Sequence, residues 1–380
     1  PPRSTLFPYT TLFRSFSSQG TTGGPISMLN NNTLNNSDFL SAAFPAEYGN
    51  ALSGVFDLKM KTGNNEKHEF TGQLSINGLE FGAEGPLTSS NQSSYLIHYR
   101  YADFTIVDKI VNLGISGVPK FQDISFKLLF PFVKGNISLF GLAGSSDLAL
   151  LDKDADSTDL SFSDSRKNTY FGSDMATCGV SATWFMKHQA ISKFIVSGFF
   201  ERIRNNVDTL DFNDTPFSVY NDFSTDKRLY LKYLYSKKIN PRLSLKTGAG
   251  INKMMFDLNS KVYIESLNEH KDILNEKINF SNGPLLSTIF NQWQYKFSEK
   301  ITINTGVHIL YFDLNKKIAV EPRAGILWEA NPRHRFSLGY GLHSKQQSVI
   351  TYLAKSYLSD GTYLQTNKKI GFTKAQHFVF

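Results

Sequence analysis

FPAEYGNALSGVFDLKMKTGNNEKHEFTGQLSINGLEFGAEGPL, residues 44–87, changes character in its middle. Up to Gly63, glycine-containing turns separate short apolar runs, and the alternation in Val55–Met60 predicts one short strand of a small mixed module. From Phe70 onward polar and apolar residues alternate, which predicts a longer strand that stops at Gly85-Pro86. The stretch therefore contains the boundary between two structural regimes.

Strands with the same alternation follow for the rest of the chain, joined by connections that are short and long in turn. We predict short turns at Pro86–Ser93, Pro131–Asn136, Met186–Gln189, Lys237–Pro241, Phe297–Lys300 and Ala330–His334. Long polar stretches lie near residues 103–120, 146–168, 204–224, 257–282 and 343–373. This rhythm is typical of outer-membrane barrels, which have short periplasmic turns and long extracellular loops.

The two-residue period gives each strand an apolar and a polar face. In Arg335–His343, for example, Phe336 and Leu338 alternate with polar residues or glycine. A soluble sandwich shows the same alternation with the apolar face inward, so the period by itself leaves both folds open. Strand lengths of about 10 residues favour a membrane barrel. The longest apolar runs, such as Leu128–Val133, are far shorter than the roughly 20 residues of a spanning helix.

The composition excludes several classes of function. The single cysteine, Cys178, excludes a disulfide framework and a cysteine-based zinc site. The net charge of +7 is spread over many segments, so we expect no nucleic-acid partner. Catalytic motifs are absent, and Asp152–Asp156 begins like a calcium loop but has Ser157 and Ser163 where that loop needs Gly and Glu. We therefore predict no enzyme, no cofactor and no metal site.

Several motifs resemble one family. Glu47-Tyr48-Gly49, Gly54-Val55 and Lys61-Thr62-Gly63 are similar to the end of the plug domain of TonB-dependent outer-membrane receptors, in the variety found in the Bacteroidetes. Ala319–Gly325 and Gly339–His343 resemble barrel strands of the same family. Members commonly carry Arg before the Tyr-Gly pair, whereas this chain has Glu47, so an ion pair of the family would have its sign reversed here.

The resemblance implies an all-β fold, an incomplete transmembrane antiparallel β-barrel that follows the C-terminal end of a plug. We count about 13 strands, the last at Lys374–Phe380, whereas large plugged transporters have about 22. Residues 17–63 are then the end of the plug and residues 64–380 the partial barrel. The opening Pro1–Ser15 is similar to a translated sequencing-adapter peptide, so residues 1–16 are expected to be non-native or disordered and the chain to be a fragment.

The function that the resemblance implies is active uptake of a scarce nutrient, such as siderophore-bound iron, cobalamin or an oligosaccharide, across the outer membrane. Its partners are that small ligand, outer-membrane lipid and the TonB complex, which is contacted through a segment upstream of Gly23. A passive porin would share the strands but lack the module Glu47–Gly63. A secreted, soluble β-rich glycan-binding protein would pack its apolar faces together.

Two sets of side chains are candidates for a site. The period places Arg100 and Arg323 on faces that point into the predicted lumen, and a carboxylate in a lumen with little water needs a partner. We therefore hypothesise that Glu47 pairs with Arg100 or Arg323, the alternative being that Glu47 bonds only backbone amides or water. Exposed aromatic residues at a barrel mouth can hold a ligand, and the candidates in a predicted long loop are Phe212, Phe217, Tyr220 and Phe223.

Overall fold

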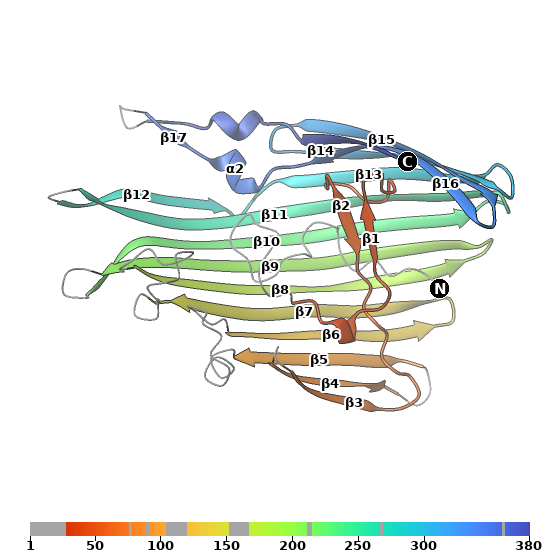
Figure 1. Cartoon of the computed structure of the whole chain (residues 1–380), viewed down its shortest axis with the longest axis horizontal. Coiled ribbons are helices and arrows are strands. Elements are labelled where there is room, and N and C mark those ends of the chain that lie inside the picture. The colour runs from red at the N-terminus through yellow and green to blue at the C-terminus, as the bar shows by residue number, and fades with distance from the viewer. Residues whose placement is uncertain are drawn as a thin grey trace.

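The computed structural model is nearly all-β (Figure 1). It describes residues 28–75, 78–88, 92–103, 120–151, 167–210, 215–266, 269–358 and 362–380, with the backbone alone at 262–266, 269–276 and 357. In this part of the chain no helix has the length and apolar character needed to cross a membrane.

One antiparallel sheet of 15 strands dominates the described residues. Neighbours in the sheet follow chain order, except that β12 pairs only with β11 and β19 follows β16. We call this sheet the wall. Its strands are β3 (Glu69–Ser75), β4 (Gly78–Pro86), β5 (Ser94–Asp103), β6 (Lys120–Phe132), β7 (Gly135–Leu150), β8 (Lys167–Met186), β9 (Ala190–Leu210), β10 (Pro216–Lys238), β11 (Leu243–Ser266), β12 (Glu269–Phe280), β13 (Leu285–Lys296), β14 (Ile301–Phe312), β15 (Lys317–Asn331), β16 (His334–Lys345) and β19 (Thr373–Val379).

The connections at one end of the wall are the predicted short turns. Each of the six falls between two described strands that pair with each other, from β4–β5 to β15–β16. The turn between β8 and β9 uses His188 and Gln189 with φ of 58° and 55°. These turns lie at the right of Figure 1.

The predicted single strand from Phe70 to Gly85-Pro86 is wrong. The structure has two strands there, β3 and β4, which pair antiparallel from Glu69 opposite Glu84 to Ser75 opposite Gly78. Gly78 has a φ of 108°, a backbone conformation that residues other than glycine rarely adopt. Ser75 and Gly78 therefore belong to two paired strands, although the alternation of residue types continues from one to the other.

Two of the predicted long loops are wrong as well, because residues 204–224 and 257–282 are mostly strand. β10 has 23 residues, or about 76 Å at roughly 3.3 Å per residue, and a membrane crossing takes only about 10. Outside a bilayer both faces of a hairpin are wet, so polar residues suit both. The stretch 343–373 holds α2 (Val349–Leu353), β17 (Ser356–Tyr357), β18 (Tyr363–Leu364) and η3 (Thr366–Lys369). Residues 104–119 and 152–166 lie outside the described residues.

The two faces of the wall confirm that the apolar side chains of its strands point outward and the polar ones inward. On β15 and β16, Ile326 and Phe336 are 45% and 55% exposed on the outer face. Glu321 and Arg323 on the other face are 0% and 5% exposed. A soluble sandwich would cover the apolar face instead. The wall therefore presents an apolar outside and a polar inside.

A small unit crosses the polar face of the wall (Figure 1). It contains η1 (Asn31–Thr33) and two paired strands, β1 (Asp38–Ser41) and β2 (Gly54–Asp57). The short strand predicted at Val55–Met60 is thus present, although it begins and ends earlier. Its own core consists of Phe44, Tyr48, Ala51 and Val55. We call residues 28–63 the inner module.

Candidate functional site

A single line of paired residues on the wall holds the inner module. Because directly paired residues of neighbouring strands share a face, one line of register places their side chains side by side. We call this set the docking line, and from β11 to β19 it consists of Lys246, Gln292, Gly306, Arg323, Gly341 and His377. All six meet the loop 43–52 of the inner module or lie against it.

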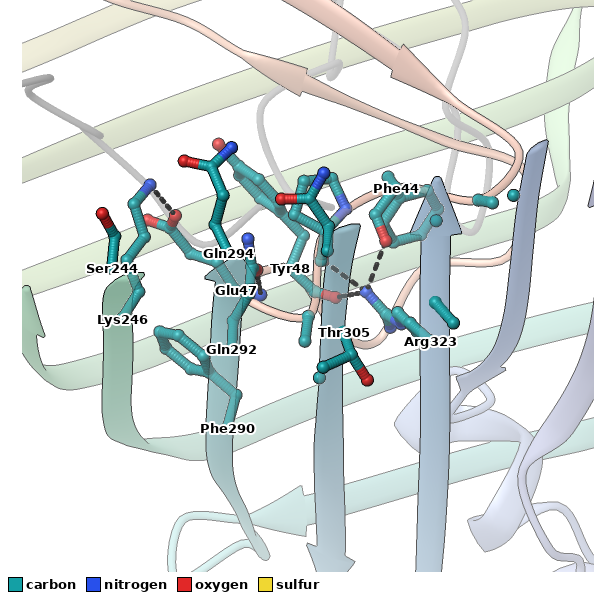
Figure 2. A pocket seen from close by; sticks show the side chains of 18 of the residues that line it. Phe44, Glu47, Tyr48, Ser244, Lys246, Phe290, Gln292, Gln294, Thr305 and Arg323 are labelled. Atoms are coloured by element: carbon teal, nitrogen blue, oxygen red, sulfur yellow. Dashed lines mark hydrogen bonds and ion pairs between the residues drawn. The ribbon is translucent and has the colours of Figure 1, made fainter. Parts of the chain in front are cut away.

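Arg323 is the most connected member of the docking line (Figure 2). Its Nη1 donates to the carbonyl oxygens of Phe44, Pro45 and Tyr48 at 3.3, 2.6 and 2.5 Å. Its Nη2 donates to Glu321 Oε2 at 2.5 Å, and the guanidinium carbon lies 4.8 Å from the centre of the Phe44 ring. Burying a guanidinium is costly unless its charge and its donors are matched. Here Glu321 matches the charge and both Nη atoms have acceptors, whereas the buried Nε has no hydrogen-bond partner among the described residues.

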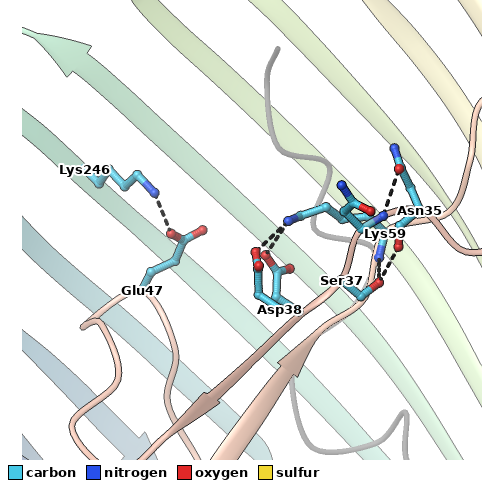
Figure 3. A network of polar contacts seen from close by, with 8 residues as sticks. Asn35, Ser37, Asp38, Glu47, Lys59 and Lys246 are labelled. Carbon is cyan, nitrogen blue, oxygen red and sulfur yellow. Dashed lines mark hydrogen bonds and ion pairs between the residues drawn. The ribbon is translucent and has the colours of Figure 1, made fainter. Parts of the chain in front are cut away.

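Glu47 does not pair with either predicted arginine. Its carboxylate accepts from Lys246 Nζ at 3.1 Å, and its backbone N–H donates to Gln292 Oε1 at 3.4 Å (Figures 2 and 3). Arg323 reaches the same loop, but it binds carbonyl oxygens there. Arg100 pairs with Asp123, its register neighbour on β6, at 2.6 Å. Each arginine is thus neutralised by a carboxylate of the wall itself.

Two glycines of the docking line let the module approach the backbone of the wall. A Cβ added at Gly306 would lie 2.8 Å from the Cβ of Ala46, and one at Gly341 would lie 3.3 Å from the Cα of Ala43. Gly49 makes the reciprocal approach, because its added Cβ would lie 2.0 Å from Nε2 of His308. His308 also places Nδ1 2.8 Å from the carbonyl oxygen of Ala46.

The remaining motif residues hold the module together or lead it to the wall. Tyr48 is buried, and Gly54 begins β2 beside the ring of Phe39. Lys61 contributes its backbone N–H, which donates to Thr33 at 2.8 Å. A Cβ at Gly63 would lie 1.9 Å from the carbonyl oxygen of Tyr95, so this glycine permits a close pass over β5.

The module carries one buried carboxylate besides Glu47. Asp57, at the end of β2, has its Oδ2 3.6 Å from Lys59 Nζ, which also binds Asp38 at 2.8 Å (Figure 3). Burial raises the pKa of the Asp57 carboxyl above its usual 3.8, and the Lys59 ammonium opposes this rise in part.

The predicted ligand-contacting aromatic residues are not gathered in a loop. Phe217, Tyr220 and Phe223 lie within β10, and Phe212 lies outside the described residues. Phe223 is exposed, with the Arg202 guanidinium 5.8 Å from its ring centre. The loop assignment of Phe217, Tyr220 and Phe223 was wrong because β9 and β10 remain paired far beyond the length of a membrane crossing.

A cavity of about 770 Å³ lies beside these contacts, between the module and the part of the wall near the short turns. Figure 2 shows side chains that line it. Its charged lining residues are Glu47, Asp57, Lys193, Lys246 and Arg323. Within the described ranges, no group of three or more His, Cys, Asp or Glu side chains could hold a metal ion. The site is thus a polar contact between module and wall with an open space beside it.

No protein-family model and no curated protein matches the chain. The antiparallel wall nevertheless has the fold of TonB-dependent siderophore receptors. A mutant of the ferric enterobactin receptor PfeA from Pseudomonas aeruginosa is 14% identical, with a TM-score of 0.62 over 93% of this chain and 56% of that chain. The siderophore receptor PirA from Acinetobacter baumannii is 15% identical, with a TM-score of 0.53 over 83% and 48%.

A third solved structure, the complex of FpvAI with pyocin S2, is 12% identical, with a TM-score of 0.61 over 83% of this chain and 46% of that chain. The chain therefore spans about half the length of these solved structures. At such low identities the likeness concerns the fold alone.

Proposed function

We propose that this chain is part of a TonB-dependent receptor of the outer membrane that takes up a scarce nutrient. The candidate nutrients are siderophore-bound iron, cobalamin and an oligosaccharide. The observation that carries the proposal is the inner module, which is docked by buried polar contacts on the inner face of a wall whose outer face is apolar. In this proposal residues 17–63 are the end of a plug and residues 64–380 a partial barrel of the Bacteroidetes variety.

The proposed activity needs an external source of work. A plugged lumen stops diffusion, so concentrating a solute requires two states of the plug that bind the solute or the barrel differently. The TonB complex supplies the energy for that change. The contacts of Glu47 and Arg323 are the ones that such a change has to loosen, because they join the loop 43–52 to the wall.

Two other functions are the alternatives to nutrient uptake. A passive porin fits the strands, but it has no use for a module clamped inside its lumen. A secreted, soluble glycan-binding protein fits an all-β chain, but exposed Ile326, Phe336 and Leu338 would then face water. Neither accounts for the module and the apolar outside together.

The test is transport by the full-length receptor in cells. We expect uptake of one of the three radiolabelled nutrients, lost on deletion of TonB and on addition of a proton uncoupler. Liposomes that contain the purified receptor should not swell in small sugars. Swelling without TonB would overturn the proposal in favour of a passive channel, and extraction of the protein without detergent would favour the soluble alternative.

A further inference from the structure

The cavity beside the inner module lies on a defined side of the docking line. Lys193 follows the short turn between β8 and β9, and Lys246 follows the turn between β10 and β11, and both line the cavity. Figure 2 shows Ser244, Lys246 and Gln294 around the side chain of Glu47. The cavity thus lies between the module and the end of the wall that carries the short turns.

One charged group of the cavity lining has no direct partner. Glu47 is paired with Lys246 and Arg323 with Glu321, and Asp57 lies 3.6 Å from Lys59, which it shares with Asp38. Lys193 is 7% exposed and has neither an ion-pair nor a hydrogen-bond partner among the described residues. At longer range it interacts with the ammonium groups of Lys127 and Lys232 and with the carboxylates of Glu47 and Asp57. One buried lysine beside the cavity therefore has no direct partner.

The other polar groups of the lining can donate hydrogen bonds as well as accept them. These amide and hydroxyl side chains include six on the four strands β10, β11, β13 and β14, namely Ser236, Ser244, Thr247, Gln292, Gln294 and Asn304. A buried cation without a partner is costly, and an anion that accepts from it and from neighbouring donors offsets that cost. The lining therefore fits a small solute that carries anionic oxygens.

We infer that this cavity is an anion-binding station at which a solute with carboxylate, catecholate or phosphate oxygens rests after it has passed the inner module. Lys193 stays in place on β9 and is the group of the station that pairs with the anion. Lys246 becomes a second cation when Glu47 moves away with the module. The inference rests on the proposed uptake function for the identity of the solute, but the preference of the cavity for anions does not depend on transport.

The test measures the charge preference of the cavity directly. In the full-length receptor, Cys178 is replaced by Ser and Ser244→Cys introduces a thiol in the lining. The thiol is modified by an anionic sulfonate and by a cationic trimethylammonium methanethiosulfonate, each rate being divided by the rate with free cysteine. We expect the normalised anionic rate to exceed the cationic rate about tenfold, as one ion contact worth about 1.4 kcal/mol would give.

Two further variants make the result specific. Lys193→Met should remove the preference and Lys193→Arg should retain it, while Lys227→Met, on the outer face of β10, should leave it unchanged. Resistance of the purified variants to trypsin shows that the module is still docked. Equal normalised rates in the Lys193 and Lys193→Met proteins would overturn the inference, and so would a Cys at 244 that neither reagent modifies. Failure of uptake with the preference intact would count against the proposed function alone.

Discussion

Arg323 concentrates the attachment of the inner module in one side chain. It holds three carbonyl oxygens of one loop and one carboxylate of its own strand, and 5% of it is exposed. Glu47 and Lys246 form a different kind of contact, because the lysine is 44% exposed and water screens the pair. The site thus combines one buried clamp with one pair that opens at little cost.

Arg323→Met should weaken the docking of the module by about 3–5 kcal/mol, because it leaves Glu321 buried without its partner. Hydrogen exchange of the backbone amides in residues 43–52 measures this change. Lys246→Met should cost less than about 1 kcal/mol in the same assay. The double variant Glu321→Gln with Arg323→Met should recover part of the loss, and a double variant weaker than Arg323→Met would contradict the assignment.

Gly49→Ala should undock the module, because the new Cβ would lie 2.0 Å from the His308 ring. Trypsin cleavage after the exposed Lys61 is the measurement, and we expect a higher rate in the variant. The compensating change is His308→Gly, which makes room for the methyl group and should lower the cleavage rate again in the double variant. Persistent rapid cleavage in that double variant would show that the close approach is not the cause.

The stability of the inner module should depend on pH through the protonation of Asp57. Its pKa is raised in the folded protein, so the stabilisation that comes from its protonated form is complete below about 3.8 and is lost as the pH rises through the raised pKa. Asp57→Asn should therefore be at least as stable as the parent at neutral pH, and its stability should vary less as the pH rises above about 3.8. Thermal unfolding in detergent measures the stability and its change with pH. Asp38→Asn, at a half-exposed position, is the control.

At the scale of the elements, the docking line depends on the alternation of long side chains and glycine across neighbouring strands. β11, β13 and β15 present Lys246, Gln292 and Arg323, whereas β14 and β16 present glycine at the same level. The long side chains reach toward the loop, and the glycines let it sink between them. The register of the wall therefore determines where the loop 43–52 of the inner module can pack.

The outer parts of the longest strands should be separable from the wall. β12 pairs only with β11, from Phe256 opposite Phe280 to Ser266 opposite Glu269. Removal of residues 261–275, with Ser260 and Glu276 joined by a short glycine-rich turn, should leave the thermal midpoint and the trypsin resistance of the module nearly unchanged. Loss of membrane insertion in this variant would show that the hairpin belongs to the structural core of the wall.

At the scale of the whole molecule, the two faces of the wall require different surroundings. Its outer face carries Leu229, Leu231 and Tyr233 on one strand, while the inner face of the same strand carries Arg228, Tyr230 and Lys232. Such a wall is stable only where hydrocarbon covers one side and polar groups or water cover the other.

Leu231→Arg should destabilise the protein by about 2–4 kcal/mol in lipid vesicles, because it places a charge in the apolar belt. Tyr235→Arg, nearer the short turn on the same face, should cost about 0–1 kcal/mol because its charge lies close to the interface. Urea unfolding in vesicles measures both. Equal costs at the two positions would argue against a bilayer around this face.

The sequence by itself determined what depends on neighbouring residues. The two-residue period predicted which residues share a face, and the short breaks in that alternation predicted all six short turns. The close approaches of Gly49 and Gly63 lie in a motif that is recognisable without coordinates. The sequence did not reveal that β3 and β4 are separate strands or how long β10 is, because the alternation continues through both.

Only the tertiary structure decided which side chains meet. Glu47 and Lys246 lie 199 residues apart, and their pairing depends on the register of β11 within the wall and on where the module sits. The ion-pair partners predicted for Glu47 were Arg100 and Arg323, with backbone amides or water as the alternative, yet both arginines are bound by carboxylates of the wall. The unpaired Lys193 was missed for the same reason, since a charge is unpaired only relative to neighbours that the fold brings together.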